Sequence, residues 1–186
     1  MPFEFDTLEC NIFGNFKAGD NAGYNSQLLC DLVEANEDGK FNKPIVLQAA
    51  SLIEVGAFQI FYRAQKYNLE GVPNVSKEDQ QKIENKQIDK FAVIIDNLKK
   101  YQILDGMGAD IYEDLHTLRK YRNKIHIQSH VDISNVAKDE DRVFTDAFTQ
   151  WSIDLNWRVL SHFAEYYSRP EHIRGFVQPL RLPKLY

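Results

Sequence analysis

The sequence is poor in the features that stabilise secreted domains or anchor a chain in a membrane. It contains only two cysteines in 186 residues, Cys10 and Cys30, so a disulfide framework is excluded and we expect two reduced thiols. No positively charged and then apolar leader opens the chain. The long apolar stretch at residues 45–65 contains Gln48, Glu54 and Gln59, which argues against a membrane span. We therefore expect a cytoplasmic protein with no membrane partner.

Glycine and proline are also scarce, with nine and six residues, which argues against a turn-rich β-sandwich. The chain has no glycine-rich phosphate loop, no serine-triad motif and no dinucleotide fingerprint. What it has instead is a high aromatic content of 12 Phe, 9 Tyr and 2 Trp, within an apolar fraction of 44%. This composition is typical of one globular domain with a sizeable core.

The spacing of apolar residues predicts an all-α fold, an antiparallel bundle of four to five main helices. We expect helices over residues 45–65, 76–101, 110–128 and 141–167, and a shorter one over residues 26–35. Asn42 and Ser76 are the expected helix caps. Residues 1–42, rich in Asn and Gly, predict an irregular acidic arm, and residues 171–186, with Pro179 and Pro183, predict an extended tail. Residues 43–170 would then form the helical domain.

Charge is distributed unevenly along the chain. Residues 1–42 carry eight acidic and two basic side chains, a net charge of −6. In contrast, the stretch from Arg119 to His130 contains Arg119, Lys120, Arg122 and Lys124 and no acidic residue. A protein that binds nucleic acid over its whole surface would be more basic than this chain. The basic cluster is sufficient for one small anionic site.

The helix expected over residues 110–128 places a charged residue on its apolar face. At 100° per residue Arg122 lies about 20° from Ile111, inside the stripe that should be buried. Arg119 and His126 lie at the edge of that stripe, and Lys120 and Lys124 point to the opposite, solvated side. An unpaired buried guanidinium is costly, so an anionic group must meet Arg122. Either Glu54 fills this role as a packing partner, or a ligand phosphate does, and both arrangements are compatible.

The run Leu118-Arg119-Lys120-Tyr121-Arg122-Asn123-Lys124-Ile125-His126 resembles the signature helix of the HEPN superfamily (higher eukaryotes and prokaryotes nucleotide-binding domains). That signature is an arginine, usually followed by a polar residue, with a histidine after four to six intervening residues. Arg122 is followed by Asn123, and three residues lie between Arg122 and His126. Six residues lie between Arg119 and His126. Residues 50–54 also resemble the early helix of such domains. The resemblance covers residues 43–170 and implies a HEPN-like bundle.

The resemblance implies a dimeric, metal-independent endoribonuclease that cleaves RNA through its own 2′-hydroxyl and needs no cofactor. A histidine can transfer the protons and an arginine can stabilise the charge on phosphorus. The expected roles are His126 as acid and base, Arg122 and Arg119 as phosphate clamps and Asn123 as an orienting group, with Glu54, His130 and Lys124 in support. Such an enzyme would be a toxin or an antiviral-defence effector with a regulatory or antitoxin protein partner. The acidic residues 1–42 could then shield the basic helix.

Two other functions are compatible with the same residues. The chain could be a catalytically inactive HEPN-like module that binds a protein partner or a nucleotide, or a helical adaptor in which the arginines only pack. His116, His126 and His130 lack a further cysteine or acidic ligand at a suitable spacing, so no metal site is expected. Arg158 and His162 lie on the apolar stripe of the last helix, either as a packed pair or as an RNA contact.

Overall fold

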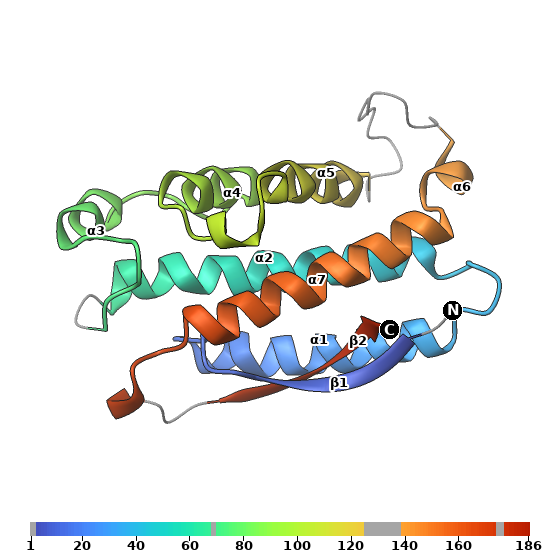
Figure 1. Ribbon diagram of the computed structural model, residues 1–186, viewed down its shortest axis with the longest axis horizontal. Coiled ribbons are helices and arrows are strands. Elements are labelled where there is room, and N and C mark those ends of the chain that lie inside the picture. The colour runs from blue at the N-terminus through green and yellow to red at the C-terminus, as the bar shows by residue number, and fades with distance from the viewer. Residues whose placement is uncertain (1–2, 68–69, 125–138, 174–176) are drawn as a thin grey trace.

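The computed structural model describes residues 3–67, 70–124, 139–173 and 177–186, and it is mainly helical (Figure 1). In chain order the elements are β1 (Phe3–Cys10), α1 (Phe16–Glu34), α2 (Asn42–Lys66), α3 (Lys77–Ile83), α4 (Phe91–Lys100), the 3₁₀ turn η1 (Asp105–Met107), α5 (Ile111–Asn123), α6 (Glu140–Val143), α7 (Asp146–Tyr166), the 3₁₀ turn η2 (Glu171–Ile173) and β2 (Gln178–Leu185). The predicted all-α class is therefore correct in its main part and incomplete, because a small sheet is present.

The helices form three layers, with α2 and α7 in the middle (Figure 1). α4 and α5 cover one side of this pair, and α1 and the sheet cover the other. α2 and α7 run in the same direction, as the hydrogen bond of 2.9 Å from Asn156 Nδ2 to the Ala49 carbonyl and the contact between Leu160 and Gly56 indicate. The predicted antiparallel arrangement is therefore wrong for this central pair. A side chain at Gly56 would place its Cβ 3.0 Å from Leu160 Cδ2, so glycine permits this close helix contact.

The N-terminal segment is ordered, and the predicted irregular arm is wrong. Residues 16–34 form the long helix α1, which begins where the Asn15 side chain accepts a hydrogen bond of 3.2 Å from the Ala18 backbone N–H. The buried face of α1 carries small residues, among them Gly19, Ala22 and Ser26. Glycine and asparagine read as turn formers in the sequence, whereas here they supply a small-residue face and a helix cap. α1 packs closely on α2 and β2 as a result.

The two chain ends pair with each other as an antiparallel sheet, with a register from Phe3↔Leu185 to Cys10↔Gln178. The tail is extended, as predicted, but it forms a strand that packs on α1 and α7. Leu180 and Leu182 of β2 are fully buried in the core. Pro179 and Pro183 are tolerated because both strands of a two-stranded sheet are edge strands.

Two of the expected long helices are each divided into two. Between α3 and α4, the Gln65 side-chain amide donates to the carbonyls of Ile83 at 2.8 Å and Lys86 at 2.7 Å. In a continuous helix these carbonyls would instead accept hydrogen bonds from backbone N–H groups one turn later. Between α6 and α7, Thr145 accepts a hydrogen bond of 3.2 Å from the Phe148 N–H and caps α7. A glutamine from α2 therefore binds the carbonyls exposed after α3, and a threonine cap determines where α7 begins.

The two predicted caps had different outcomes. Ser76 caps α3 as expected, since its hydroxyl accepts a hydrogen bond of 3.1 Å from the Asp79 N–H. Asn42 does not act as a cap: it is the first residue of α2, it is buried, and its amide donates to the Phe144 carbonyl at 3.0 Å. Asn42 therefore links the start of α2 to the segment that leads into α7.

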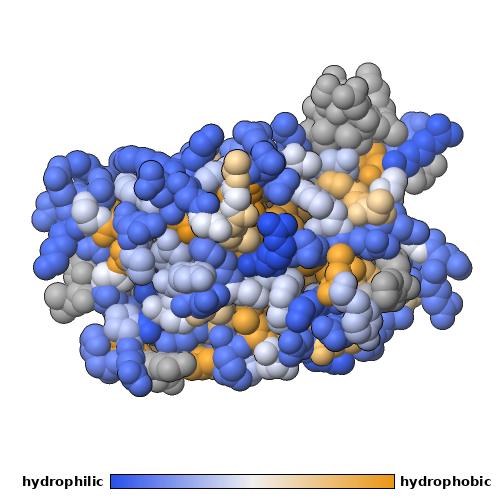
Figure 2. All heavy atoms as spheres, viewed as in Figure 1, coloured by the Kyte–Doolittle hydropathy of each residue, from blue (hydrophilic) through white to orange (hydrophobic). Residues whose placement is uncertain are grey.

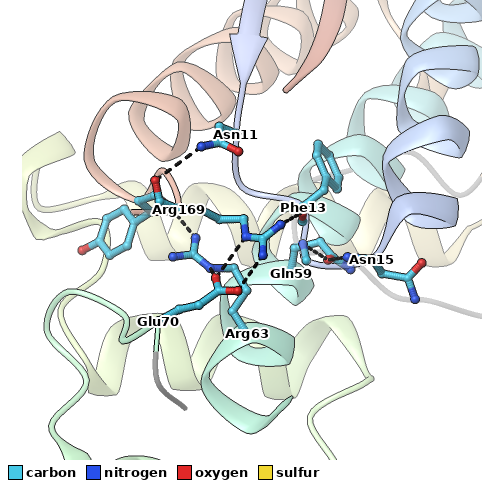
Figure 3. A network of polar contacts seen from close by, with 9 residues as sticks. Asn11, Phe13, Asn15, Gln59, Arg63, Glu70 and Arg169 are labelled. Carbon is cyan, nitrogen blue, oxygen red and sulfur yellow. Dashed lines mark hydrogen bonds and ion pairs between the residues drawn. The ribbon is translucent and has the colours of Figure 1, made fainter. Parts of the chain in front are cut away.

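A buried ionic cluster links the segment between β1 and α1 to the C-terminal ends of α2 and α7 (Figure 3). Arg169 donates to both carboxylate oxygens of Glu70, at 3.0 and 2.6 Å. Arg63 lies on the other side with its Nε 3.5 Å from Glu70, and it donates to the Tyr167 carbonyl. The backbone N–H of Arg169 donates to the Asn11 carbonyl at 2.8 Å. We call Arg63, Glu70 and Arg169 the arginine clamp.

By length and composition, α2 is the one helix of the described residues that could cross a membrane. In the fold, 61% of its most apolar window is buried inside the protein. The core helix of a soluble protein has the same properties, so the structure is compatible with a soluble protein.

Candidate functional site

The residues singled out in the sequence border one surface pocket between α2, α4 and α5. The pocket has a volume of about 390 Å³. It is lined by Glu54, Asp89, Lys90, Phe91, Ala92, Arg119, Arg122 and Asn123. Four of the seven residues proposed from the sequence, namely Glu54, Arg119, Arg122 and Asn123, are therefore together in space. We refer to this site as the arginine pocket.

The centre of the arginine pocket is an ion pair between α5 and α2. Arg122 Nη2 lies 2.8 Å from Glu54 Oε2, which is the packing partner considered from the sequence. The Arg122 side chain is 37% exposed and that of Glu54 is 18% exposed. Burial raises the pKa of Glu54, and the charge and hydrogen bond of Arg122 counteract part of that rise.

Arg122 lies at the border of the buried face of α5, whereas the helical projection placed it inside that face. The fully buried side chains of α5 are Leu115 and Leu118, with Ile111 almost as buried, and Tyr121 extends the face toward Phe144 and Phe148. Arg122 lies in the last turn of α5, beyond these buried side chains, and is 37% exposed. The guanidinium consequently stays accessible from the pocket while it contacts Glu54.

Arg119 has an unmet hydrogen-bonding group beside the same pocket. Its Nε is buried and has no hydrogen-bond partner among the residues that the structure describes. A buried N–H of a cation with no acceptor is unfavourable, and the Arg119 side chain also lines the arginine pocket, where a bound anion would lie beside this cation. Arg119 lies one turn before Arg122 on α5, so both guanidinium groups border one cavity.

The first turn of α4 forms another wall of the pocket, which was not predicted from the sequence. α4 begins after Lys90 with no side-chain cap and with no acidic residue in its first turn. Its first N–H groups carry the positive end of the helix dipole, which favours anions. The residues of α4 were predicted to be helical, but its start was missed because no glycine or proline marks the break between Ile83 and Phe91. The remaining signal was the new apolar stripe of Phe91, Ile94, Ile95 and Leu98.

The residues that line the arginine pocket carry a small net positive charge. Lys90, Arg119 and Arg122 are cationic, and Glu54 and Asp89 are acidic, which leaves a net of one positive charge among the lining residues. The uncapped end of α4 adds to it. This arrangement can hold one phosphate or carboxylate group, with directional hydrogen bonds from guanidinium N–H groups.

The remaining predicted residues of this region fall in three places. Lys124 is buried at the end of α5 and is absent from the pocket lining, so its expected solvated position is wrong. The helix ends at Asn123, so the projection of an ideal helix no longer applies to Lys124. Lys120 is exposed, as expected. His126 and His130 lie outside the described residues.

His116 is the imidazole nearest to this site along α5. Its Nε2 lies 3.6 Å from Asp96 Oδ1, and burial together with the charge of Arg119 lowers its pKa. It does not line the pocket. Within the described parts of the chain, no three His, Cys, Asp or Glu side chains are grouped as metal ligands would be.

The two polar residues noted on the last helix each have their own partner. Arg158 pairs with Asp154 at 3.4 Å, one turn away on α7, and His162 Nε2 lies 3.0 Å from the Ile103 carbonyl. Both side chains line cavities on a different part of the protein from the arginine pocket.

Comparisons with known protein families, with curated proteins and with solved structures found no match. The resemblance to the HEPN signature helix therefore rests on the residues of α5 and on those that follow it.

Proposed function

We propose that the chain is a metal-independent endoribonuclease of the HEPN type, and that the arginine pocket binds the phosphate at which RNA is cleaved. The observation that carries this proposal is that Arg119, Arg122 and the uncapped start of α4 line one pocket. Two guanidinium groups and a helix N-terminus around one cavity fit a phosphate group better than a neutral ligand.

The chemistry assigns a separate role to each group. The RNA 2′-oxygen attacks the adjacent phosphorus, the bond from phosphorus to the 5′-oxygen breaks, and a 2′,3′-cyclic phosphate remains. One proton leaves the 2′-hydroxyl and one is delivered to the 5′-oxygen. Arg119 and Arg122 stabilise the negative charge on the phosphorane, and Asn123 donates a hydrogen bond to it. His126, assigned from the sequence, transfers the protons, and DNA is no substrate because it lacks the 2′-hydroxyl.

Glu54 acts in this proposal as a positioning residue. Its carboxylate holds Arg122 at 2.8 Å and thereby fixes the direction of the guanidinium toward the pocket. Because Glu54 uses one edge of the guanidinium, the other N–H groups of Arg122 remain for the phosphate. The resemblance further suggests that two copies of the chain bring two such sets together, and that the enzyme acts as a toxin or defence effector under a regulatory or antitoxin protein.

A second candidate function is supported by the same ion pair. Arg122 already has a carboxylate partner, which offsets much of the charge that a catalytic arginine would offer to a phosphate. A catalytically inactive module that binds a protein partner or a nucleotide through Arg119 would have this arrangement. The two functions differ in whether a covalent bond in RNA is broken.

The test is cleavage of a structured RNA by the purified protein in excess EDTA. We expect products that end in 2′,3′-cyclic phosphate, and we expect His126→Ala to abolish them at an unchanged melting temperature. The matched control is His172→Ala, which removes an exposed histidine of η2 that is absent from the pocket lining. Binding of an RNA with 2′-deoxy linkages, with no cleavage of the normal RNA, would contradict the enzyme and favour the binding module.

A further inference from the structure

A second cavity lies where the C-terminal end of α7 meets two connecting segments. It has a volume of about 490 Å³, within the range of small-molecule sites. It is lined by Pro73, Asn74, Gln102, Ile103, Gly106, His162, Tyr166 and Tyr167. These residues come from the turn before α3, the end of α4, η1 and the end of α7. We call this site the tyrosine pocket.

The lining of the tyrosine pocket is aromatic and polar but nearly uncharged. Apart from His162, none of its lining residues carries a charge near neutral pH. Tyr166 is 57% exposed, and its ring lies 4.8 Å from that of His162. Gln102 adds a side-chain amide that can donate and accept hydrogen bonds, and Asn74, whose two N–H groups are used within the protein, adds its Oδ1 as an acceptor. An uncharged planar ring with donors and acceptors on its edge fits this chemistry.

The backbone at this pocket adopts unfavourable conformations at two positions that are not glycine. Asn74 has a φ of 65° and follows Pro73 in the turn closed by the Val75 N–H and the Val72 carbonyl at 3.1 Å. Gln102 has a φ of 55°. Non-glycine residues held in this region cluster at functional sites.

Gln102 is the more informative of the two. The N–H groups of Gln102 and Ile103 donate to the carbonyls of Lys99 and Leu98 at 3.1 and 2.9 Å, which is the Schellman ending of α4. Glycine is the favoured residue at that left-handed position, and glutamine is less stable there. A glutamine at this position is explained if its side chain has a use in the pocket it lines.

The side chains around the pocket are held in place before any ligand arrives. Asn74 Nδ2 donates to the Gln102 carbonyl at 3.0 Å and to the Tyr167 hydroxyl at 3.3 Å. The Ile103 carbonyl accepts from His162 Nε2 at 3.0 Å, so Nδ1 is the acceptor of the neutral ring. Such fixed groups lower the entropy cost of binding.

An adjoining cavity of about 330 Å³ shares His162 with the tyrosine pocket. Its lining includes Ser161, whose hydroxyl is buried and has no partner among the described residues. It also includes Arg158 and Glu165, whose opposite charges offset each other. A sugar attached to a base in the tyrosine pocket would lie beside Ser161 there, and a phosphate gains little from this lining. On the face that carries α7, the apolar areas are small and separated by polar ones (Figure 2), which fits a small ligand better than a protein partner.

We propose that the tyrosine pocket binds an unpaired nucleobase, stacked on Tyr166 and hydrogen-bonded by Asn74 and Gln102, with the attached ribose beside Ser161. Bases of single strands are recognised in this way, by stacking on aromatic rings and by hydrogen bonds to their edges. The base belongs either to a free nucleoside or to single-stranded RNA. Binding at this pocket does not depend on RNA cleavage at the arginine pocket.

The test uses 2-aminopurine riboside, a base analogue whose fluorescence is quenched by stacking. We expect quenching by the wild-type protein, at least about fivefold weaker binding in Tyr166→Ala, and near-normal binding in Tyr166→Phe. The matched control is Tyr24→Ala, which removes another exposed tyrosine, on α1, that does not line the tyrosine pocket. No quenching by the wild-type protein, or equal losses in Tyr166→Ala and Tyr24→Ala, overturns the proposal.

Gln102→Gly separates binding from folding. Glycine relieves the left-handed backbone, so this variant should melt at a higher temperature than the wild type while it binds the riboside more weakly. Weaker binding in a more stable protein cannot come from misfolding. Unchanged binding in Gln102→Gly overturns the role of the glutamine amide.

Two further arms identify the source of the base. Adenosine 5′-monophosphate should compete no better than adenosine, and clearly tighter binding of the phosphate overturns base recognition as the basis of the site. A short RNA carrying 2-aminopurine, tested with the His126→Ala variant, should bind more tightly than the riboside if the base comes from RNA, and equally if it comes from a free nucleoside. Both outcomes of this last arm support the pocket, and failure of RNA cleavage leaves them unaffected.

Discussion

The arginine clamp and the arginine pocket each contain two arginines and one glutamate, yet they differ in how far these groups are open to solvent and to a ligand. In the clamp, the side chains of Arg63, Glu70 and Arg169 are 1%, 8% and 12% exposed, and both arginines reach the same carboxylate. In the pocket, Glu54 contacts Arg122 alone, and a cavity of about 390 Å³ opens beside Arg119. The clamp is closed by the protein itself, whereas the pocket has room for an outside anion.

The comparison indicates that a buried arginine is not by itself evidence for function. Arg63 is the most buried arginine of the described residues, and its position is explained by the fold, because it ties α2 to the end of α7 through the Tyr167 carbonyl. Arg119 is less buried as a residue, and its Nε has no hydrogen-bond partner in the described part of the chain, which is also true of Nε and Nη2 of Arg63. The cavity that Arg119 lines together with Arg122, and neither burial nor an unmet donor, distinguishes the candidate site.

The largest expected effect is on stability, from the Glu70→Gln variant. Removal of the charge leaves two buried guanidinium groups without a counter-ion, and we expect a loss of about 3–5 kcal/mol in the free energy of unfolding. The matched variant Glu54→Gln should lose no more than about 1 kcal/mol, because the pair with Arg122 is partly exposed to solvent. Urea denaturation of both variants measures the difference. Equal losses would show that the two sites are energetically alike.

The next effect is on RNA cleavage, from Arg119→Gln and Arg122→Gln. Loss of one guanidinium that stabilises the phosphorane should lower the rate constant by about 10²–10³. Arg142→Gln is the control, because Arg142 is exposed on α6 and does not line the pocket. Single-turnover cleavage rates in EDTA measure all three variants. A rate loss in Arg122→Gln alone would restrict phosphate binding to Arg122.

The difference between the two regions also explains what the sequence could predict. The pair of Arg122 and Glu54 was predictable, because helical periodicity placed a charge beside a buried stripe and Glu54 interrupts an otherwise apolar helix. The clamp was not, because Arg169 follows α7 and Glu70 lies beyond α2, where no periodicity relates them. Contacts between irregular segments are set by tertiary packing.

In the fold, too, regular apolar spacing was predictable and tertiary packing was not. α2 and α7 were predicted nearly in full because their apolar spacing is regular. α1 was largely missed because its buried face consists of small residues such as Gly19 and Ala22, which carry little hydrophobic signal. β2 was expected only as an extended tail, because prolines lack the N–H of a strand and only the pairing with β1 defines the sheet. The break between α3 and α4 was not predicted, so the first turn of α4 was not recognised as a helix start.

A smaller effect concerns pH and tests the state of Glu54. Burial raises the pKa of Glu54 in the folded protein above its ordinary value of 4.5. Between 4.5 and the raised pKa the folded state binds more protons than the unfolded state, so the free energy of unfolding decreases as pH rises through this window. We expect this contribution to stay below about 1 kcal/mol, because the pair is partly exposed. The wild-type protein should show it and Glu54→Gln should lack it, measured as the difference between their urea midpoints at each pH. Parallel pH profiles would contradict the raised pKa.

The smallest expected effect is the change in stability of Arg119→Met. The Nε of Arg119 makes no internal hydrogen bond among the described residues. Methionine is an unbranched apolar side chain of similar length, so the substitution removes no hydrogen bond of this atom. We expect the free energy of unfolding to change by less than about 1 kcal/mol. The measurement is urea denaturation with RNA cleavage followed in the same preparation. A stable Arg119→Met protein that no longer cleaves RNA assigns Arg119 to the ligand. A loss as large as that of Glu70→Gln would instead make Arg119 a structural arginine, equivalent to those of the arginine clamp.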